Sequence, residues 1–206
     1  MLELFLSAFI TLFVVIDPPG CAPIYAGLTA DASPRDRRAM AVRACVVAAL
    51  ILLFFLAVGQ DVLSALQIEL DSFRIAGGIM LFLIALDMVF ETRTQRREQR
   101  AEKVRDTPGV EDVSVFPMAI PMLAGPGSIS SVMLLESTAE GLAGTLVVLG
   151  ALVAVLLLTL AALLVAAPLM RVFGSRVEAV LTRLLGVLLA ALAAQYVIDG
   201  IRGTFP

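Results

Sequence analysis

The stretch FVVIDPPGCAPIYAGLT, residues 13–29, decides how this chain folds. It is apolar enough to enter a membrane, but Asp17 and three prolines interrupt it. Proline removes a backbone donor and clashes with the preceding turn, so a Pro-Gly cluster inside an apolar run predicts an interrupted helix. We therefore expect residues 2–29 to form a membrane span that is broken near Pro18 and Gly20.

A second stretch, FPMAIPMLAGPGSIS at residues 116–130, has the same character. Three prolines and two glycines lie within fifteen residues that are otherwise apolar or small. The same steric argument predicts an interrupted helix here. We expect residues 113–135 to form a second broken span.

The composition of the whole chain requires lipid as part of its solvent. Of 206 residues, 60% are hydrophobic and 16% are charged, and the mean hydropathy is +0.98. A soluble domain of this size carries roughly 45–50% apolar and about 25% charged residues. A bilayer core needs about 20 apolar residues per helix. We predict an all-α membrane protein with six spans, of which the first and fourth are discontinuous; the four ordinary spans are residues 39–58, 73–90, 141–170 and 177–201.

Several function classes are excluded by the residues available. The chain has no His, the commonest metal ligand and general base near neutral pH. The apolar segments offer no paired carboxylates and only two distant cysteines, Cys21 and Cys45, so we expect neither an enzyme nor a metal site. Twelve charges are concentrated in residues 91–112, which leaves no basic face for nucleic acid.

Basic residues gather in every second connection between the predicted spans. The positive-inside rule places such connections in the cytoplasm, so we expect both termini to lie outside. The third connection, residues 91–112, holds six basic and six acidic residues. We expect a solvated linker there, with extension of the flanking helices by charge pairs as the alternative. The orientation depends on Arg35, Arg37, Arg38, Arg93, Arg96, Arg97, Arg100, Lys103, Arg105, Arg171 and Arg176.

The two halves of the chain resemble each other weakly. PPGC at residues 18–21 aligns with GPGS at 125–128, and RIAG at 74–77 aligns with RLLG at 183–186. Because each half has three spans, the second copy must enter the membrane from the opposite side, as in the inverted repeats of secondary transporters. We expect a first three-helix repeat, a charged cytoplasmic linker and a second, inverted repeat at residues 1–90, 91–112 and 113–206.

Each predicted break is a place where a ligand can bind. A break in hydrocarbon frees N–H and C=O groups that are costly unless protein, water or ligand satisfies them. A helix that begins just after Gly20 or Gly127 directs free N–H groups and the positive end of its dipole at the gap, which suits a carboxylate. Ser128 adds a hydroxyl there, although bonding back to the preceding helical turn explains that residue equally well.

Four segments, together about a third of the chain, resemble the MarC family of bacterial and archaeal inner-membrane proteins. The DPxG motif at residues 17–20 and the IPxLAGPG motif at 120–127 carry most of the similarity. The resemblance implies a six-span protein of the bacterial cytoplasmic membrane that transports small neutral amino acids such as glycine and alanine. Cys21 departs from the family pattern, because Asn or another small polar residue is usual there and a thiol is a weaker hydrogen-bond partner. The segments are residues 13–29, 74–88, 116–130 and 183–201.

Three polar residues inside the predicted spans have two explanations each. Asp17 can cap the helix that follows it or couple transport to H⁺ by reversible protonation. Asp87 can serve the same coupling or pair with a loop arginine. Gln195 can contact substrate or hydrogen-bond to a neighbouring helix. The coupling candidates are Asp17 and Asp87, and the predicted substrate-binding residues are Asp17, Pro18, Gly20, Cys21, Pro23, Gly125, Pro126, Gly127, Ser128 and Gln195.

Together these patterns predict a secondary transporter that binds a small zwitterionic amino acid between the broken ends of the first and fourth spans. A channel-like pore or an exporter of another small solute, built on the same breaks, is the alternative. The expected partners are the small-molecule substrate and the lipid bilayer, and whether the protein forms a homo-oligomer is left open. No cofactor is expected beyond a coupling ion, H⁺ or Na⁺.

Overall fold

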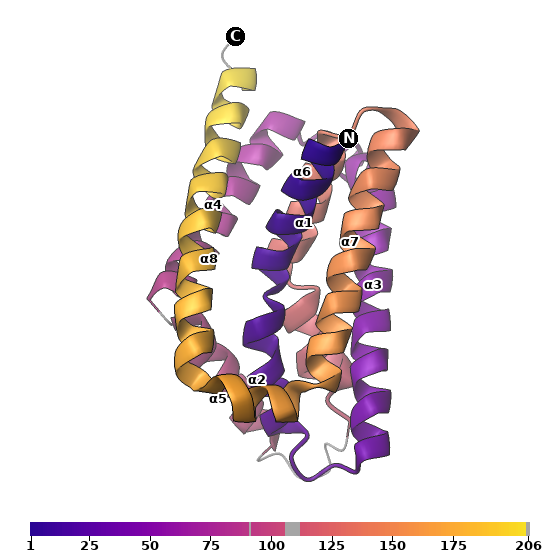
Figure 1. Cartoon of the computed structure of the whole chain (residues 1–206). Helices are drawn as coiled ribbons and strands as arrows, with labels where there is room; N and C mark the ends of the chain where they lie inside the picture. The colour runs from indigo at the N-terminus through magenta and orange to yellow at the C-terminus, as the bar shows by residue number, and fades with distance from the viewer. Residues whose placement is uncertain (91, 106–111, 205–206) are drawn as a thin grey trace.

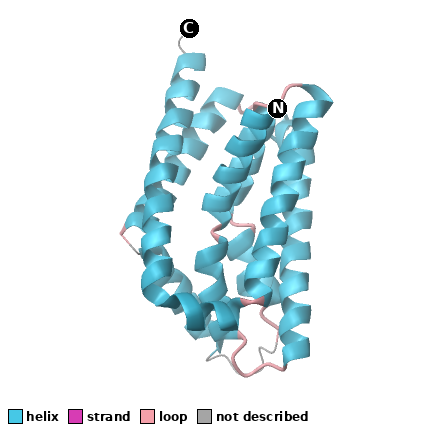
Figure 2. Cartoon of the chain, viewed as in Figure 1, coloured by secondary structure: helices cyan, strands magenta, loops and turns pink. Residues whose placement is uncertain are grey.

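The computed structural model of the chain describes residues 1–90, 92–105 and 112–204; the side chains of residues 92–94, 100, 103–105 and 167–179 are outside that description. Every regular element in the described part is a helix (Figure 1, Figure 2). The predicted all-helical class is therefore confirmed. The elements are α1 (Leu2–Ile16), α2 (Pro18–Leu28), α3 (Pro34–Ala65), α4 (Leu70–Val89), α5 (Thr92–Arg105), η1 (Ser114–Leu123), α6 (Pro126–Ser137), α7 (Gly141–Leu164) and α8 (Ala166–Thr204).

Five segments of the described chain are long and apolar enough to cross a membrane. The count becomes six if η1 and α6, which are bent by 51° relative to each other, make one span; the alternative is a re-entrant segment. A membrane protein with five or six spans is therefore what the structure supports. The five segments are Leu2–Leu28, Pro34–Ala65, Leu70–Val89, Gly141–Leu164 and Val180–Thr204.

The segment made of α1 and α2 lies in the middle of the bundle (Figure 1). In its most apolar stretch 56% of the residues are buried, against 22–39% in the other four candidate spans. The exposed apolar side chains of the outer helices suit contact with lipid, whereas Leu12, Ile16 and Tyr25 are enclosed by protein. Whatever interrupts the helix near Asp17 therefore lies inside the protein.

Helices α4 and α8 run antiparallel and pack closely along their lengths. Small residues permit this approach, as is common between membrane helices. A Cβ atom on Gly78 would lie 2.8 Å from the carbonyl oxygen of Ala193, and one on Gly200 would lie 2.8 Å from that of Asp71. Backbone lies against backbone at both positions, so only glycine fits without displacing a helix.

The charged third connection differs from the expected solvated linker. Residues Thr92–Arg105 form α5, which packs against α2, α4 and η1. The side chain of Arg97 is buried although its neighbours in α5 are mostly exposed. The physical reason is a buried acid, described below, that needs a cationic partner. Residues 91 and 106–111 of this connection lie outside the described residues.

The boundary between the last two spans also lies at a different place from the predicted one. The span predicted at 141–170 ends at Leu164, and α8 begins at Ala166, so the predicted fifth connection, 171–176, lies within a helix. Pro168 accounts for the difference, because proline is tolerated in the first turn of a helix, where its missing N–H has no intrahelical partner. The first turns of α8 cross one end of the bundle before the helix turns along it (Figure 1).

Both ends of the described chain lie at the same end of the bundle (Figure 1). The connection between α2 and α3, helix α5 and the junction of α7 with α8 lie at the opposite end (Figure 1). The connections that were predicted to be cytoplasmic are thus on one side of the bundle. Which side faces the cytoplasm stays a prediction from the basic residues.

Candidate functional site

Asp17 stands between the end of α1 and the start of α2. Its backbone is left-handed, with φ 60° and ψ 64°, a conformation that Asp tolerates better than most residues. Its carboxylate accepts a hydrogen bond of 3.1 Å from the backbone N–H of Gly20 and so caps α2. The capping role that the sequence suggested for Asp17 is therefore present in the structure.

The residues after Asp17 complete this junction. A Cβ atom on Gly20 would lie 2.3 Å from Oδ2 of Asp17, so the carboxylate can fold back over the helix start only because residue 20 is glycine. The thiol of Cys21 donates to the carbonyl oxygen of Ile16 at 3.4 Å. That carbonyl belongs to the last turn of α1, where helix carbonyls lack an intrahelical partner. Cys21 thus satisfies a backbone carbonyl at the end of α1.

The second oxygen of Asp17 is paired with Arg97 of α5. Nη1 of Arg97 donates to Oδ2 of Asp17 at 3.0 Å, and the exposed fractions of the two residues are 7% and 1%. A buried ion pair removes two charges from solvent, so neither charge can stay without the other except at high cost. The pair therefore fixes α5 to the centre of the bundle.

The preceding residue of α5 is paired with the other predicted coupling acid. Nη1 of Arg96 lies 2.6 Å from Oδ2 of Asp87, near the end of α4. This pair is more accessible, since 63% of the Arg96 side chain is exposed. Pairing of Asp87 with a loop arginine was one of the two explanations that the sequence left open, and the structure contains such a pair.

Arg96 and Arg97 border a cavity of about 170 Å³ beside the start of α6. An engineered protein cavity of about 150 Å³ is large enough to hold benzene. A small organic molecule therefore fits. We call this space the α6 cavity; its lining residues are Val15, Ile84, Asp87, Arg96, Arg97, Pro121, Met122, Gly125, Pro126, Gly127 and Ser128.

The sequence of η1 and α6 explains the shape of this wall. Phe116 and Ile120 have extended backbones inside η1, as residues that precede proline prefer. Pro126 then starts α6, and no side chain caps that helix start. The first turn of a helix leaves its N–H groups without intrahelical partners, and here Gly127 and Ser128 of that turn line the cavity. This wall can accept an anionic group.

Two glycines allow the backbone at the start of α6 to lie close to its neighbours. A Cβ atom on Gly125 would lie 2.3 Å from the carbonyl oxygen of Pro121, a backbone atom that cannot rotate away. One on Gly127 would lie 2.4 Å from Cδ1 of Ile84, the flexible end of a side chain in the cavity wall. Gly125 is thus required for the turn itself, whereas Gly127 sets the width of the space beside α4.

The structure brings some of the predicted residues together and separates others. Five of them, Asp87 and residues 125–128, line the α6 cavity, and Asp17 joins this group through Arg97. Pro18 is buried in the first turn of α2. Pro23 lines a different space, of about 340 Å³, between α2 and α5. The amide of Gln195 is exposed on α8 and donates to Asp199 of the same helix at 2.8 Å, away from the α6 cavity.

The sequence reasoning did not assign Arg96 and Arg97 to the site. A charged run of this kind is usually solvated, and no pattern within it marks one arginine as buried. The available signal was indirect, because acids inside a membrane protein need partners. Matching Asp17 and Asp87, two acids inside the predicted spans, with the nearby arginines would have pointed to this segment.

Comparison with known proteins extends the similarity beyond the motifs. The sequence profile described as MarC family integral membrane protein matches residues 2–205. A UPF0056 membrane protein of Archaeoglobus fulgidus is 34% identical over 97% of this chain and 93% of its own length. The UPF0056 inner membrane protein YhgN of Escherichia coli K12 is 34% identical over 96% and 95%, and the UPF0056 membrane protein YvbG of Bacillus subtilis is 31% identical over 100% and 98%. No solved structure matches the chain.

Proposed function

Since this chain belongs to the MarC family of integral membrane proteins, we propose that it is a secondary transporter of small neutral amino acids such as glycine and alanine. The substrate binds in the α6 cavity. The observation that carries the proposal is the presence of both signs of charge in this small space, from Asp87, Arg96 and Arg97.

A zwitterion needs such a site. Each of its charges is costly to bury unless an opposite charge or a hydrogen-bond partner receives it. The substrate carboxylate binds the uncapped first turn of α6 and the guanidinium of Arg97, and the ammonium group binds Asp87. Two acids and two arginines balance each other around the cavity, so a ligand without net charge leaves that balance unchanged.

The proposal includes an inverted repeat with discontinuous first and fourth spans. Three features support it. The segment of α1 and α2 is interrupted at Asp17, and that of η1 and α6 is bent by 51°. The two segments run in opposite directions through the bundle (Figure 1). The third helices of the two halves, α4 and α8, are antiparallel. A substrate site between paired interrupted helices is usual for this architecture.

Coupling to H⁺ or Na⁺ is assigned to Asp17 and Asp87. In this structure both carboxylates are paired with arginine, so each must leave its partner before it can bind an ion. The carboxylate of the substrate can compensate Arg97 at that moment. Binding of substrate and binding of the coupling ion are thereby linked through one guanidinium.

Counterflow in proteoliposomes tests the transport proposal. Vesicles that contain the purified protein and unlabelled glycine should accumulate external labelled glycine or alanine with saturable kinetics, and leucine should compete poorly. Arg97→Gln should abolish this exchange. Arg43→Gln is the matched control, because Arg43 forms an exposed pair with Asp112 outside the cavity. Flux without saturation or counterflow would identify a channel-like pore, and no flux from a folded protein would refute the proposal.

Asp17→Asn tests the coupling role separately. Asn caps a helix nearly as well as Asp but carries no titratable proton. If Asp17 is the proton carrier, the variant should lose accumulation driven by an imposed pH gradient while it still exchanges bound substrate. Both activities are measured in the same proteoliposome preparation. Full accumulation by Asp17→Asn would leave Asp17 with its structural roles alone, the cap of α2 and the pairing with Arg97.

A further inference from the structure

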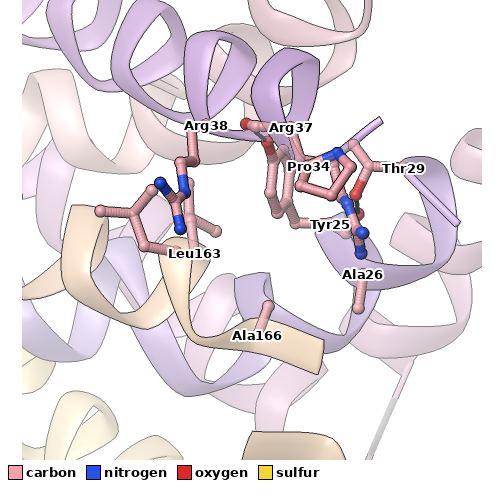
Figure 3. Close-up of a pocket in the computed structure, with 9 residues that line it drawn as sticks. Tyr25, Ala26, Thr29, Pro34, Arg37, Arg38, Leu163 and Ala166 are labelled. Carbon is pink, nitrogen blue, oxygen red and sulfur yellow. Dashed lines mark hydrogen bonds between the residues drawn. The ribbon is translucent and has the colours of Figure 1, made fainter. Parts of the chain in front are cut away.

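A second space lies at the end of the bundle where α2, α3 and the junction of α7 and α8 meet. Its volume is about 240 Å³, and Figure 3 shows the side chains around it. No residue is shared with the α6 cavity. We call it the Arg37–Arg38 pocket; its lining residues are Tyr25, Ala26, Thr29, Pro34, Arg37, Arg38, Leu163, Leu164 and Ala166.

The two hydroxyl groups on the floor of the Arg37–Arg38 pocket already donate hydrogen bonds to the backbone. The Tyr25 hydroxyl donates to the backbone carbonyl of Arg37, drawn as a dashed line in Figure 3, and so ties α2 to the start of α3. The Thr29 hydroxyl donates to the carbonyl of Tyr25 at 2.8 Å. Tyr25 and Thr29 are both buried. The polar groups left for a ligand are therefore the two guanidinium groups.

Arg37 and Arg38 differ in their ion pairing from four other arginines of the protein. Arg43, Arg74, Arg96 and Arg97 are each paired with an aspartate. Within the described part of the chain no such ion pair involves Arg37 or Arg38. A guanidinium group without a carboxylate partner favours an external anion, and the planar donor arrays of Arg37 and Arg38, which both line the pocket, match phosphate well.

The other side of the pocket is apolar. Figure 3 shows Arg38 reaching from α3 toward Leu163, the penultimate residue of α7. Leu164 beside it is 46% exposed, and Val165, which follows, is also exposed. Because α7 is a membrane span, these residues mark the level at which hydrocarbon gives way to headgroups. A ligand here meets positive charge and apolar surface at the same depth.

From this arrangement we propose that the Arg37–Arg38 pocket binds the phosphate of an anionic phospholipid headgroup, with an acyl chain along Leu164. Basic pockets between membrane helices at the headgroup level bind phosphate-bearing lipids in this way. The site is separate from the proposed transport pathway. It joins α2, which is continuous with the Asp17 junction, to α3 and to the α7–α8 junction.

The test uses the full-length protein in detergent, stripped of lipid and then titrated. Phosphatidylglycerol is the probe, phosphatidylcholine is the zwitterionic comparison and inorganic phosphate is the soluble one. The lipid that stays bound is counted by native mass spectrometry. We expect phosphatidylglycerol to bind the wild-type protein, and Arg37→Gln/Arg38→Gln to weaken that binding about thirtyfold at low salt, at roughly fivefold per arginine.

Arg35→Gln is the matched control, because Arg35 is exposed in the same helical turn and does not line the pocket. It should bind phosphatidylglycerol like the wild type. If the double variant does not fold, Arg38→Gln alone carries the test, since its side chain is exposed; a loss of about fivefold is expected. Equal binding by the pocket variants and Arg35→Gln overturns the proposal. Displacement of the lipid by millimolar inorganic phosphate assigns the site to a soluble anion instead and overturns the lipid assignment.

Discussion

Asp17 accepts a hydrogen bond from the Gly20 amide and an ion pair from Arg97 while its own backbone is left-handed. One carboxylate therefore satisfies a helix start and a buried guanidinium together. Its two oxygens are divided between these partners, so each contact can be removed by a different substitution. The residues around it thus allow separate tests of the cap and of the ion pair.

Adjacent arginines of α5 should differ strongly in their effect on stability. Arg97→Gln leaves a buried carboxylate without a partner and should cost roughly 3–5 kcal/mol. Arg96→Gln removes a pair in which the arginine is mostly exposed, and it should cost less than about 1 kcal/mol. Chemical unfolding of both variants in the same detergent measures the difference. Equal losses would mean that the Arg97 pair is no more buried in solution than the Arg96 pair.

Two glycines of α2 provide a second contrast. A methyl group on Gly20 would collide with the Asp17 carboxylate, so Gly20→Ala should lose the cap and disturb the ion pair, at a cost of about 2 kcal/mol or more. Gly27 has no atom within 4 Å of the position of a Cβ, so Gly27→Ala should be neutral or stabilising by up to about 1 kcal/mol. Thermal unfolding of the two variants tests this, and a harmless Gly20→Ala would contradict the described junction.

At the scale of elements, the antiparallel pair of α4 and α8 depends on glycine for its short separation. Gly78→Ala places a methyl group against the backbone of α8 and should destabilise the protein by about 1–3 kcal/mol. Gly150→Ala, on an open face of α7, is the matched control and should not destabilise. Unfolding temperatures and the oligomeric state of both variants are compared. A neutral Gly78→Ala would indicate that the helices are further apart than described.

The helices themselves could be predicted from the sequence, and their irregularities only in part. Apolar length located the five candidate spans, and the Pro-Gly clusters lie at the left-handed Asp17 between α1 and α2 and at the 51° bend before α6. That these two segments are discontinuous spans stays a prediction. Pro168 was the available signal for the start of α8, since proline is favoured in a first helical turn. Gln195 had a partner four residues later on its own helix, Asp199, a spacing that places both on one face.

Helix α5 could not be located by the same means. Its composition is that of a solvated segment, and hydropathy assigns it no place in the bundle. The partner of Asp17 is eighty residues away in sequence, so no local pattern connects the two. Burial of Arg97 follows from the demand of one distant acid for a cation, which is a property of the folded molecule.

At the scale of the whole molecule, the ends of the chain and the basic connections lie at opposite ends of the bundle (Figure 1). With the positive-inside rule, this arrangement predicts external termini. Thr204→Cys should react with a membrane-impermeant maleimide in intact cells, whereas Ala30→Cys, in the exposed connection after α2, should react only after permeabilisation. The natural cysteines, Cys21 and Cys45, are buried, so the wild-type chain is the blank. The reverse labelling pattern would invert the orientation.

Successive residues of α5 pair with two different acids. An insertion ahead of α5 and a deletion there should therefore differ in their effect on the buried ion pair. One residue inserted between Phe90 and Gln95 would shift the helix so that Arg96 takes the place of Arg97, and the buried carboxylate of Asp17 keeps a cation. One residue deleted there would bring Glu98 to that place and set two carboxylates against each other inside the protein. The length of the chain ahead of α5 is therefore constrained in one direction more than in the other.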